Sequence, residues 1–222
     1  MNRLKLIGSA LVVVVALSAI AVSGASAALP EFSSTFPNTF KSKGGAATFE
    51  QKGGLAPVSA TSSEGKGEIT SAKGGTFDEL FLGTTAPLSG KCTGLDDKTI
   101  GSVLAKGTFK LGYLDAAKTK PGLAFTLNPE THFECEKTIT LVTVRGCAAG
   151  ELGPTGPPKR FIFNVTLTQA GGVNTFTQIL NATNTAFEEC KLLSEINGGT
   201  FKQSGQATKP EITTAKEAEL LA

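Results

Sequence analysis

The chain has 222 residues, of which 40% are hydrophobic and only 18% are charged. Arg3 and Lys5 lie in a predicted signal segment, and removing them from the 21 basic residues leaves 19, equal to the 19 acidic residues. A balanced charge without a basic run excludes the electrostatic footprint of a nucleic-acid-binding protein.

Residues 1–27 have the pattern of a secretory signal peptide. Arg3 and Lys5 give a basic start, Leu11 to Val22 is apolar, and Ala25-Ser26-Ala27 is a small-residue cleavage site. We therefore predict cleavage after Ala27, with an uncleaved membrane anchor as the alternative. The mature chain has no second apolar run long enough to span a membrane. The expected location is secreted or extracellular, with association with the cell surface as an open extension.

The mature chain divides by composition into two parts. Residues 28–45 are rich in Ser, Thr, Pro and Gly, and we expect a flexible lead-in there. Residues 46–222 are expected to form a single β domain, with two small β subdomains as the alternative.

Short alternating segments separated by Gly, Pro and Asn turns follow along the chain, which is the pattern of antiparallel strands. The predicted strands cover residues 47–51, 57–61, 67–71, 76–82, 99–105, 108–114, 123–127, 161–167, 174–180, 186–196 and 200–203. The last eight residues, AKEAELLA, favour a helix by intrinsic propensity, and a closing strand is the alternative.

The stretch from His132 to Cys147 is the longest apolar, β-branched run in the mature chain. We interpret it as one central strand that ends at Gly146. Its apolar positions change parity near Leu141 and Val142, which indicates either burial on both faces or a β-bulge. With no long helical segment expected, the fold class is all-β: an antiparallel β-sandwich, or a barrel-like domain, stapled by disulfides.

Four cysteines in an exported protein predict two disulfides. If Cys135 and Cys147 lie at opposite ends of one strand, twelve residues at ~3.3 Å each hold them ~40 Å apart, so they cannot bond to each other. The sequential pairing, Cys92–Cys135 with Cys147–Cys190, closes two loops of equal span and is favoured. The crossed pairing, Cys92–Cys147 with Cys135–Cys190, stays open.

Six short motifs occur in an order that resembles a group of uncharacterised exported bacterial proteins found in many paralogous copies. The resemblance covers most of the mature chain, and the shared order carries it rather than any single motif. In chain order the motifs are Gly67-Glu68-Ile69-Thr70, Lys91-Cys92-Thr93, Leu111-Gly112-Tyr113-Leu114-Asp115, Phe133-Glu134-Cys135, Val142-Thr143-Val144-Arg145-Gly146 and Asn197-Gly198-Gly199-Thr200-Phe201.

The resemblance implies no catalytic residue, because the group has no known activity. Its members carry one cysteine ahead of the G-E-I motif and another in an F-x-G-C motif. In this chain Ser59 or Ala60 and Thr84 stand at those two places, so that bridge is absent.

The resemblance also bears on the remaining cysteines. Those matching Cys92 and Cys135 are usual in the group, whereas a serine is common at the position of Cys147. Cys147 and Cys190 would then be a pair particular to this chain, which supports the sequential pairing.

Candidate catalytic and metal-binding groups are few. His132 is the only histidine, and no G-x-S-x-G motif accompanies it, so we expect a structural or surface role. The acidic pairs are Asp96-Asp97, Glu134 with Glu136, and Glu188-Glu189. A carboxylate-based hydrolase would need such a pair across a cleft, and calcium near Asp96-Asp97 would lack EF-hand spacing.

The aromatic residues are 14 Phe, one Tyr and no Trp, which is typical of a core rather than of a sugar-binding surface. We expect no cofactor, no metal and no catalysis. The leading hypothesis is a non-enzymatic exported structural, adhesive or binding protein whose partner is a cell-envelope component or another exported protein. The alternative is a carrier of a small apolar ligand. A cavity well above ~300 Å³ would favour that carrier, and a close-packed interior would oppose it.

Overall fold

The computed structural model describes residues 30–222 except residues 55, 97–98 and 137–139, and the described part contains strands but no helix. The predicted signal peptide and its cleavage point at Ala27 lie outside the described residues. The strands are β1 (Glu31–Ser33), β2 (Asn38–Gly44), β3 (Ala47–Gln51), β4 (Val58–Ala60), β5 (Ser62–Ser71), β6 (Gly74–Leu82), β7 (Thr85–Ala86), β8 (Gly90–Gly94), β9 (Ser102–Tyr113), β10 (Pro121–Leu127), β11 (Thr131–Cys135), β12 (Thr140–Gly153), β13 (Arg160–Thr166), β14 (Gln169–Ala170), β15 (Val173–Asn174), β16 (Gln178–Leu180), β17 (Phe187–Glu189), β18 (Leu192–Ile196), β19 (Lys202–Ala207) and β20 (Glu211–Leu221).

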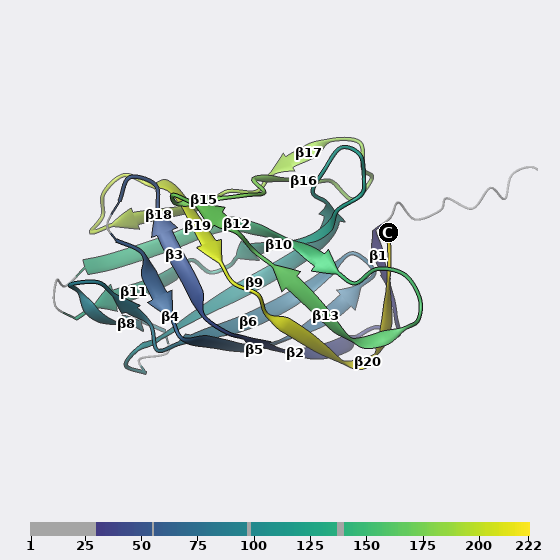
Figure 1. The fold of residues 1–222 in the computed structure, drawn as a ribbon, viewed down its shortest axis with the longest axis horizontal. Helices are drawn as coiled ribbons and strands as arrows, with labels where there is room; N and C mark the ends of the chain where they lie inside the picture. The colour runs from purple at the N-terminus through teal and green to yellow at the C-terminus, as the bar shows by residue number, and fades with distance from the viewer. Residues whose placement is uncertain (1–29, 55, 97–98, 137–139) are drawn as a thin grey trace, which may run out of the picture.

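Eight long strands close into an antiparallel barrel, rather than into a clear sandwich (Figure 1). The order around the barrel is β2-β5-β6-β9-β10-β12-β13-β20, and β20 returns to pair with β2. Every one of these pairings is antiparallel, as the short turns predict. The all-β, disulfide-stapled class is confirmed, and of the two architectures considered the barrel is the one that forms.

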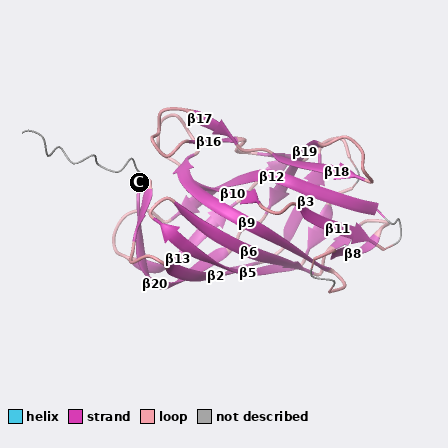
Figure 2. Cartoon of the chain, turned by 180° about the vertical axis from the view of Figure 1, so that it is seen from behind, coloured by secondary structure: helices cyan, strands magenta, loops and turns pink. Residues whose placement is uncertain are grey.

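A second ring of strands continues from the first. Its order is β3-β4-β7-β8-β11-β12-β18-β19, and β19 returns to β3. The weakest link is between β4 and β7, which share the single residue pair Ser59 and Thr85. This second ring lies at one end of the long axis of the molecule, and β1 and the C-terminus lie at the other (Figures 1 and 2).

Strand β12 belongs to both rings. Its first half pairs with β11 and β18 in the second ring, and its second half pairs with β10 and β13 in the barrel. Gly146 sits at the change-over with φ +95°, a backbone conformation that favours glycine, and a Cβ there would collide with the Lys191 carbonyl. The strand therefore continues through Gly146 instead of ending there.

The interpretation of His132 to Cys147 as one strand is wrong. The stretch contains two antiparallel strands, β11 and β12, with Phe133 directly opposite Val142. The parity change between these residues arises because the chain reverses between them, so that both side chains reach the same buried cluster. The distance argument that separated Cys135 from Cys147 was therefore based on the wrong geometry.

The disulfides are Cys92–Cys135 and Cys147–Cys190, the sequential pairing. Cys92 and Cys135 are direct register partners on β8 and β11, and both are buried in the second ring. Cys147 and Cys190 instead join β12 to the segment that follows β17. The predicted sequential pairing is therefore confirmed, although the distance estimate between Cys135 and Cys147 that supported it was wrong.

Both ends of the described chain are strands. Most of the expected lead-in, residues 28–45, is ordered, because β1 pairs with β20 and β2 is a barrel strand between β5 and β20. Phe32 of β1 is buried edge-on against Phe163 at the end of the barrel. Of the two alternatives for the C-terminal segment, the closing strand is the one that forms: β20 pairs with β2 and β13, and this pairing outweighs the helix propensity of the isolated segment. No helix among the described residues is long and apolar enough to cross a membrane.

Candidate functional site

A cavity of about 130 Å³ lies where the barrel meets the second ring. Its walls come from both rings, including Phe77 of β6 and Phe125 of β10 in the barrel and Phe133 of β11 in the second ring. Most of the lining is aliphatic or phenyl, and the phenylalanines predicted to form the core are among the residues that line it. Inward-facing Phe125 and the neighbouring Leu127 are only half-buried, in keeping with the space beside them.

One charged residue, Glu79, lines this cavity among the described residues. It lies on the inner face of β6 because the strand alternates, and Phe77 and Phe81 on either side of it share its parity. The pattern places the carboxyl group among phenyl rings. A carboxyl at an inward barrel position is unusual, since acidic side chains are seldom buried without a partner.

Small residues on the neighbouring strands leave room for this side chain. Gly65 of β5 and Ala105 of β9 are its direct register partners, and Ser42 of β2 follows beyond Gly65. A Cβ at Gly65 would collide with Glu79 Oε2, with Ser42 Oγ and with the Asp78 carbonyl. The carboxyl therefore lies across Gly65, and this is a position at which only glycine fits.

Hydrogen bonding of the carboxyl is incomplete. Ser42 Oγ donates to Glu79 Oε2, but Glu79 Oε1 is buried without a hydrogen-bond partner. Burial raises the pKa of Glu79, against the smaller lowering effects of Ser42 and Ser63, and the neighbouring charge of Glu64 raises it further. Ser63 Oγ is close enough to influence the carboxyl, yet it completes no hydrogen bond of normal geometry.

A second hydroxyl lies nearby without a partner. Thr208, in the link from β19 to β20, lines the cavity, and its buried Oγ1 has no hydrogen-bond partner. Thr208 Oγ1 and Ser63 Oγ both lie beside the bare Cα of Gly44. A methyl group added there would lie 3.5 Å from Thr208 Oγ1 and would collide with Ser63 Oγ, so the two hydroxyls are neighbours. We call Ser42, Ser63, Glu79 and Thr208 the polar cluster. Ser42, Glu79 and Thr208 line the cavity, and Ser63 adjoins them without lining it.

The residues singled out from sequence lie elsewhere. His132 is half-buried on β11 and does not line the cavity. Asp96, Glu134 and Glu136 are exposed, and Asp97 lies outside the described residues. None of the described members of the acidic pairs lines the cavity. The one charged residue of its described lining, Glu79, belongs to none of these pairs.

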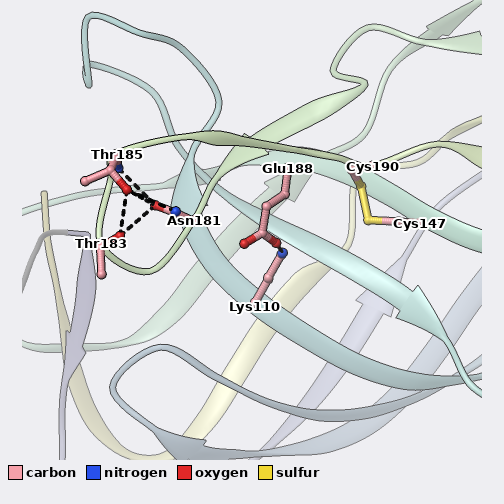
Figure 3. Close-up of polar contacts among 7 residues, drawn as sticks. All are labelled: Lys110, Cys147, Asn181, Thr183, Thr185, Glu188 and Cys190. Carbon is pink, nitrogen blue, oxygen red and sulfur yellow. Dashed lines mark hydrogen bonds and ion pairs between the residues drawn. A yellow bond between two sulfur atoms is a disulfide. The ribbon is translucent and has the colours of Figure 1, made fainter.

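The third acidic pair helps to fix a flap on the outside of the barrel. The β16–β17 hairpin packs Ile179 against Leu114, Ala124 and Ala149, which gives these outward-facing positions a cover. Lys110 of β9 forms an ion pair with Glu188, and the Cys147–Cys190 disulfide closes the base of the flap (Figure 3).

The tip of this flap is an ordered turn. Asn181 Oδ1 accepts hydrogen bonds from Thr183 Oγ1 at 3.0 Å and from the Thr185 backbone N–H at 2.9 Å (Figure 3). These contacts are an Asx-type turn that stabilises the loop between β16 and β17.

Several motifs of the resemblance have structural roles. Asp115 accepts hydrogen bonds from Thr119 and from the Lys120 backbone, and these bonds, the Thr119 side chain first, lower its pKa. The Arg145 guanidinium stacks 3.7 Å from the centroid of the Phe201 ring, which joins two motifs far apart in the sequence. These residues stabilise turns and strand packing, and none of them lines the cavity.

Sequence reasoning missed Glu79. The signal was present in Thr76 to Leu82, where Glu79 shares the parity of Phe77 and Phe81, so a carboxyl was predictable on the apolar face of that strand.

The described residues contain no group of three or more His, Cys, Asp or Glu that could hold a metal ion. No protein-family model, curated protein or solved structure matches this chain.

Proposed function

We propose that this protein is a non-enzymatic, exported binding protein that holds a small, largely apolar molecule in the cavity between its two rings. The cavity of about 130 Å³, with its phenyl and aliphatic walls, is the observation that carries this proposal. Pockets of this composition with a few polar groups are the usual form of small-molecule sites. Export is supported by the two disulfides and by the signal-like N-terminal pattern of the sequence.

The volume limits the size of the ligand. It is below the ~300 Å³ at which drug-sized pockets begin, so the size expected above for a carrier of a small apolar ligand is not reached, and the proposed ligand is smaller than a drug-sized molecule. An apolar cavity of about 150 Å³ is large enough for benzene. The proposed ligand therefore has a body of about six non-hydrogen atoms.

A binding titration with benzene and methylcyclopentane as probes tests the proposal. The matched variants are Ala105→Leu, which fills the cavity from β9, and Thr108→Leu, which adds the same side chain at an exposed position on the same strand. We expect both probes to shift NMR signals of residues that line the cavity in the wild-type protein and in Thr108→Leu, but not in Ala105→Leu. If Ala105→Leu does not fold, Val103→Phe fills the cavity from the same strand. Failure of both probes to bind the folded wild-type protein contradicts the proposal.

Attachment to the cell envelope is a second proposal, supported by a different observation. Leu88 is 92% exposed and Ile100 is 66% exposed, and both lie in turns that flank β8 at one end of the molecule. Large exposed apolar patches mark contact sites, and we propose that these two side chains belong to one. Co-sedimentation with native cell envelopes across a range of salt tests this, with Leu88→Ser and Ile100→Ser expected to weaken binding that persists in high salt. If neither substitution weakens the binding, the proposed attachment through Leu88 and Ile100 is contradicted.

A further inference from the structure

We infer that the ligand of this cavity is a small apolar primary amine whose ammonium group is held by the polar cluster beside Glu79. This inference rests on the proposed binding function and goes beyond it by naming the chemical class of the ligand. It stands on the position of Glu79 in the cavity wall, the unpartnered oxygens of Glu79 and Thr208, and the absence of a compensating cation among the described residues that line the cavity.

Two residues that line the cavity present unpartnered oxygens to an ammonium group. Glu79 Oε1 and Thr208 Oγ1 are both buried and have no hydrogen-bond partner. A primary ammonium has three N–H donors and no acceptor. Carboxylate and hydroxyl oxygens are acceptors, so an ammonium group in the cavity supplies the donors that these two atoms lack. Leaving them unsatisfied costs free energy in the empty protein, because each has lost its hydrogen bonds to water.

The charge of the site points to the same class of ligand. Glu79 is the charged residue that lines the cavity, and the charge that acts on it is that of Glu64, which has the same sign. Five basic residues on and beside the adjacent strands are exposed: Lys41, Lys43, Lys66, Lys106 and Lys209. Lys110 of β9 is half-buried and forms its ion pair with Glu188 of the flap, outside the barrel. Of the acidic residues beside them, Glu64 and Glu211 are exposed, and Asp78 is half-buried on the outer parity of β6. A cation inside the cavity would be the first opposite charge to reach this carboxyl.

The remaining walls fit the rest of the molecule. Besides these polar residues, the cavity is lined by phenyl rings and by aliphatic side chains such as Val103, Val144 and Leu192. Such walls favour a hydrocarbon body and reject a second charged group, because a charge there would lose its hydration without a partner. The carboxyl is already desolvated in the folded protein, so a ligand has only its own ammonium group to desolvate.

Three isosteric probes separate the possible ligands: cyclopentylamine, cyclopentanol and methylcyclopentane. Their binding is measured by NMR titration on the purified wild-type protein, on Glu79→Gln and on the control Glu211→Gln, which changes an exposed carboxyl on β20. We expect cyclopentylamine to bind the wild type and the control about 10- to 100-fold more tightly than methylcyclopentane, the range of a charge-assisted hydrogen bond. In Glu79→Gln this preference disappears, while methylcyclopentane still binds.

The pH dependence gives an independent readout. The ammonium group of cyclopentylamine, like that of lysine, stays charged through neutral pH, whereas the Glu79 carboxyl ionises as the pH rises from acid. Affinity for the amine should therefore increase between pH 5 and pH 8 in the wild type and stay flat in Glu79→Gln.

Each other outcome overturns a defined part of the account. Equal binding of cyclopentylamine and methylcyclopentane would overturn the amine inference and leave the proposed function intact. A preference for cyclopentanol that fades as the pH rises would mean that protonated Glu79 acts as a donor, which also overturns the amine. Failure of all three probes to bind the folded protein would overturn the proposed function itself.

Discussion

Gly65 and Glu79 face each other across β5 and β6 on the inside of the barrel, and the carboxyl group of Glu79 lies over the bare Cα of Gly65. This pair explains how a charged side chain fits into a layer of phenyl rings. The glycine supplies the space, Ser42 supplies one hydrogen bond, and one carboxyl oxygen is left unpartnered toward the cavity. The candidate site therefore depends on a residue that has no side chain.

Replacing Gly65 with alanine should displace Glu79. The added methyl group would collide with the carboxyl, with Ser42 Oγ and with the backbone carbonyl of Asp78, which cannot move away easily. We expect a loss of about 1–3 kcal/mol in the free energy of unfolding, the usual cost of overpacking, measured by urea denaturation. The matched control is Gly45→Ala, because no atom lies within 4 Å of a Cβ at that position. Equal effects of the two substitutions would contradict the proposed packing.

Replacing Glu79 with glutamine should change how stability depends on pH. The folded-state pKa of Glu79 is raised above its unfolded value by burial, so the folded protein binds the proton more tightly. The stability that this provides is fully present below the unfolded pKa and is lost as the pH rises through the folded pKa. We expect Glu79→Gln to match the wild type in acid and to be more stable than it at pH 8, as measured by thermal denaturation across pH. The exposed control Glu211→Gln should follow the wild type at every pH, and a variant Glu79→Gln that loses stability at pH 8 would contradict the assignment.

The two disulfides should contribute differently to stability although they close loops of equal length. Each spans 43 residues, for which loop-closure entropy predicts about 4 kcal/mol. Cys92–Cys135 joins paired strands of the second ring, so replacing both cysteines with alanine should lower the free energy of unfolding by about that amount.

Cys147–Cys190 holds the β16–β17 flap, so its loss should open the flap locally and lower global stability by less. Hydrogen exchange distinguishes local opening of the flap from a global loss of stability. We expect faster exchange confined to Gln178–Leu180 and Phe187–Glu189 in Cys147→Ala/Cys190→Ala. Uniformly faster exchange throughout the barrel in that variant would show that the flap does not open independently.

Asn197 should be important for the hairpin between β18 and β19. It has φ +53°, and its Oδ1 accepts a hydrogen bond of 2.8 Å from the Leu141 backbone N–H. Asn197→Ala loses this bond and strains the backbone, for a combined cost of about 2–3 kcal/mol. Asn197→Asp keeps both the acceptor and the tolerance of positive φ, so chemical denaturation should find it close to the wild type. If alanine and aspartate cost the same, the turn does not depend on this side chain.

Local patterns predicted the strands well where alternation was clear. Phe161 to Leu167 was expected as a strand and matches β13 to within one residue at each end. The Asn197-Gly198 turn was expected to connect two strands and does. These features succeed because side-chain parity and turn chemistry are encoded over a few residues.

Other features depended on partners far away in the sequence. β20 has helix-forming residues, but it lies between β2 and β13 and closes the barrel. Closure could not be predicted from local patterns, because it depends on pairing between residues about 170 positions apart, such as Phe40 and Thr214. The reversal between β11 and β12 was missed for a different reason, since no Gly, Pro or Asn marks a turn between Cys135 and Thr140.

The candidate site was only partly predictable. The parity of Glu79 between Phe77 and Phe81 was visible in the sequence. Its neighbours Ser42, Ser63 and Thr208 come from three other segments, and only the folded barrel brings their oxygens together. The acidic pairs drew attention because they are adjacent in sequence, yet their described members are exposed or form ion pairs on the surface.

The cavity between the two rings is the central claim, and a crystal pressurised with xenon tests it most directly. Xenon enters apolar cavities of this size without needing any particular polar group. We predict a xenon atom bounded by Phe77, Phe125 and Val144, and no such atom in crystals of Ala105→Leu. A wild-type crystal in which no xenon binds there, and in which these side chains fill the space, would contradict the account.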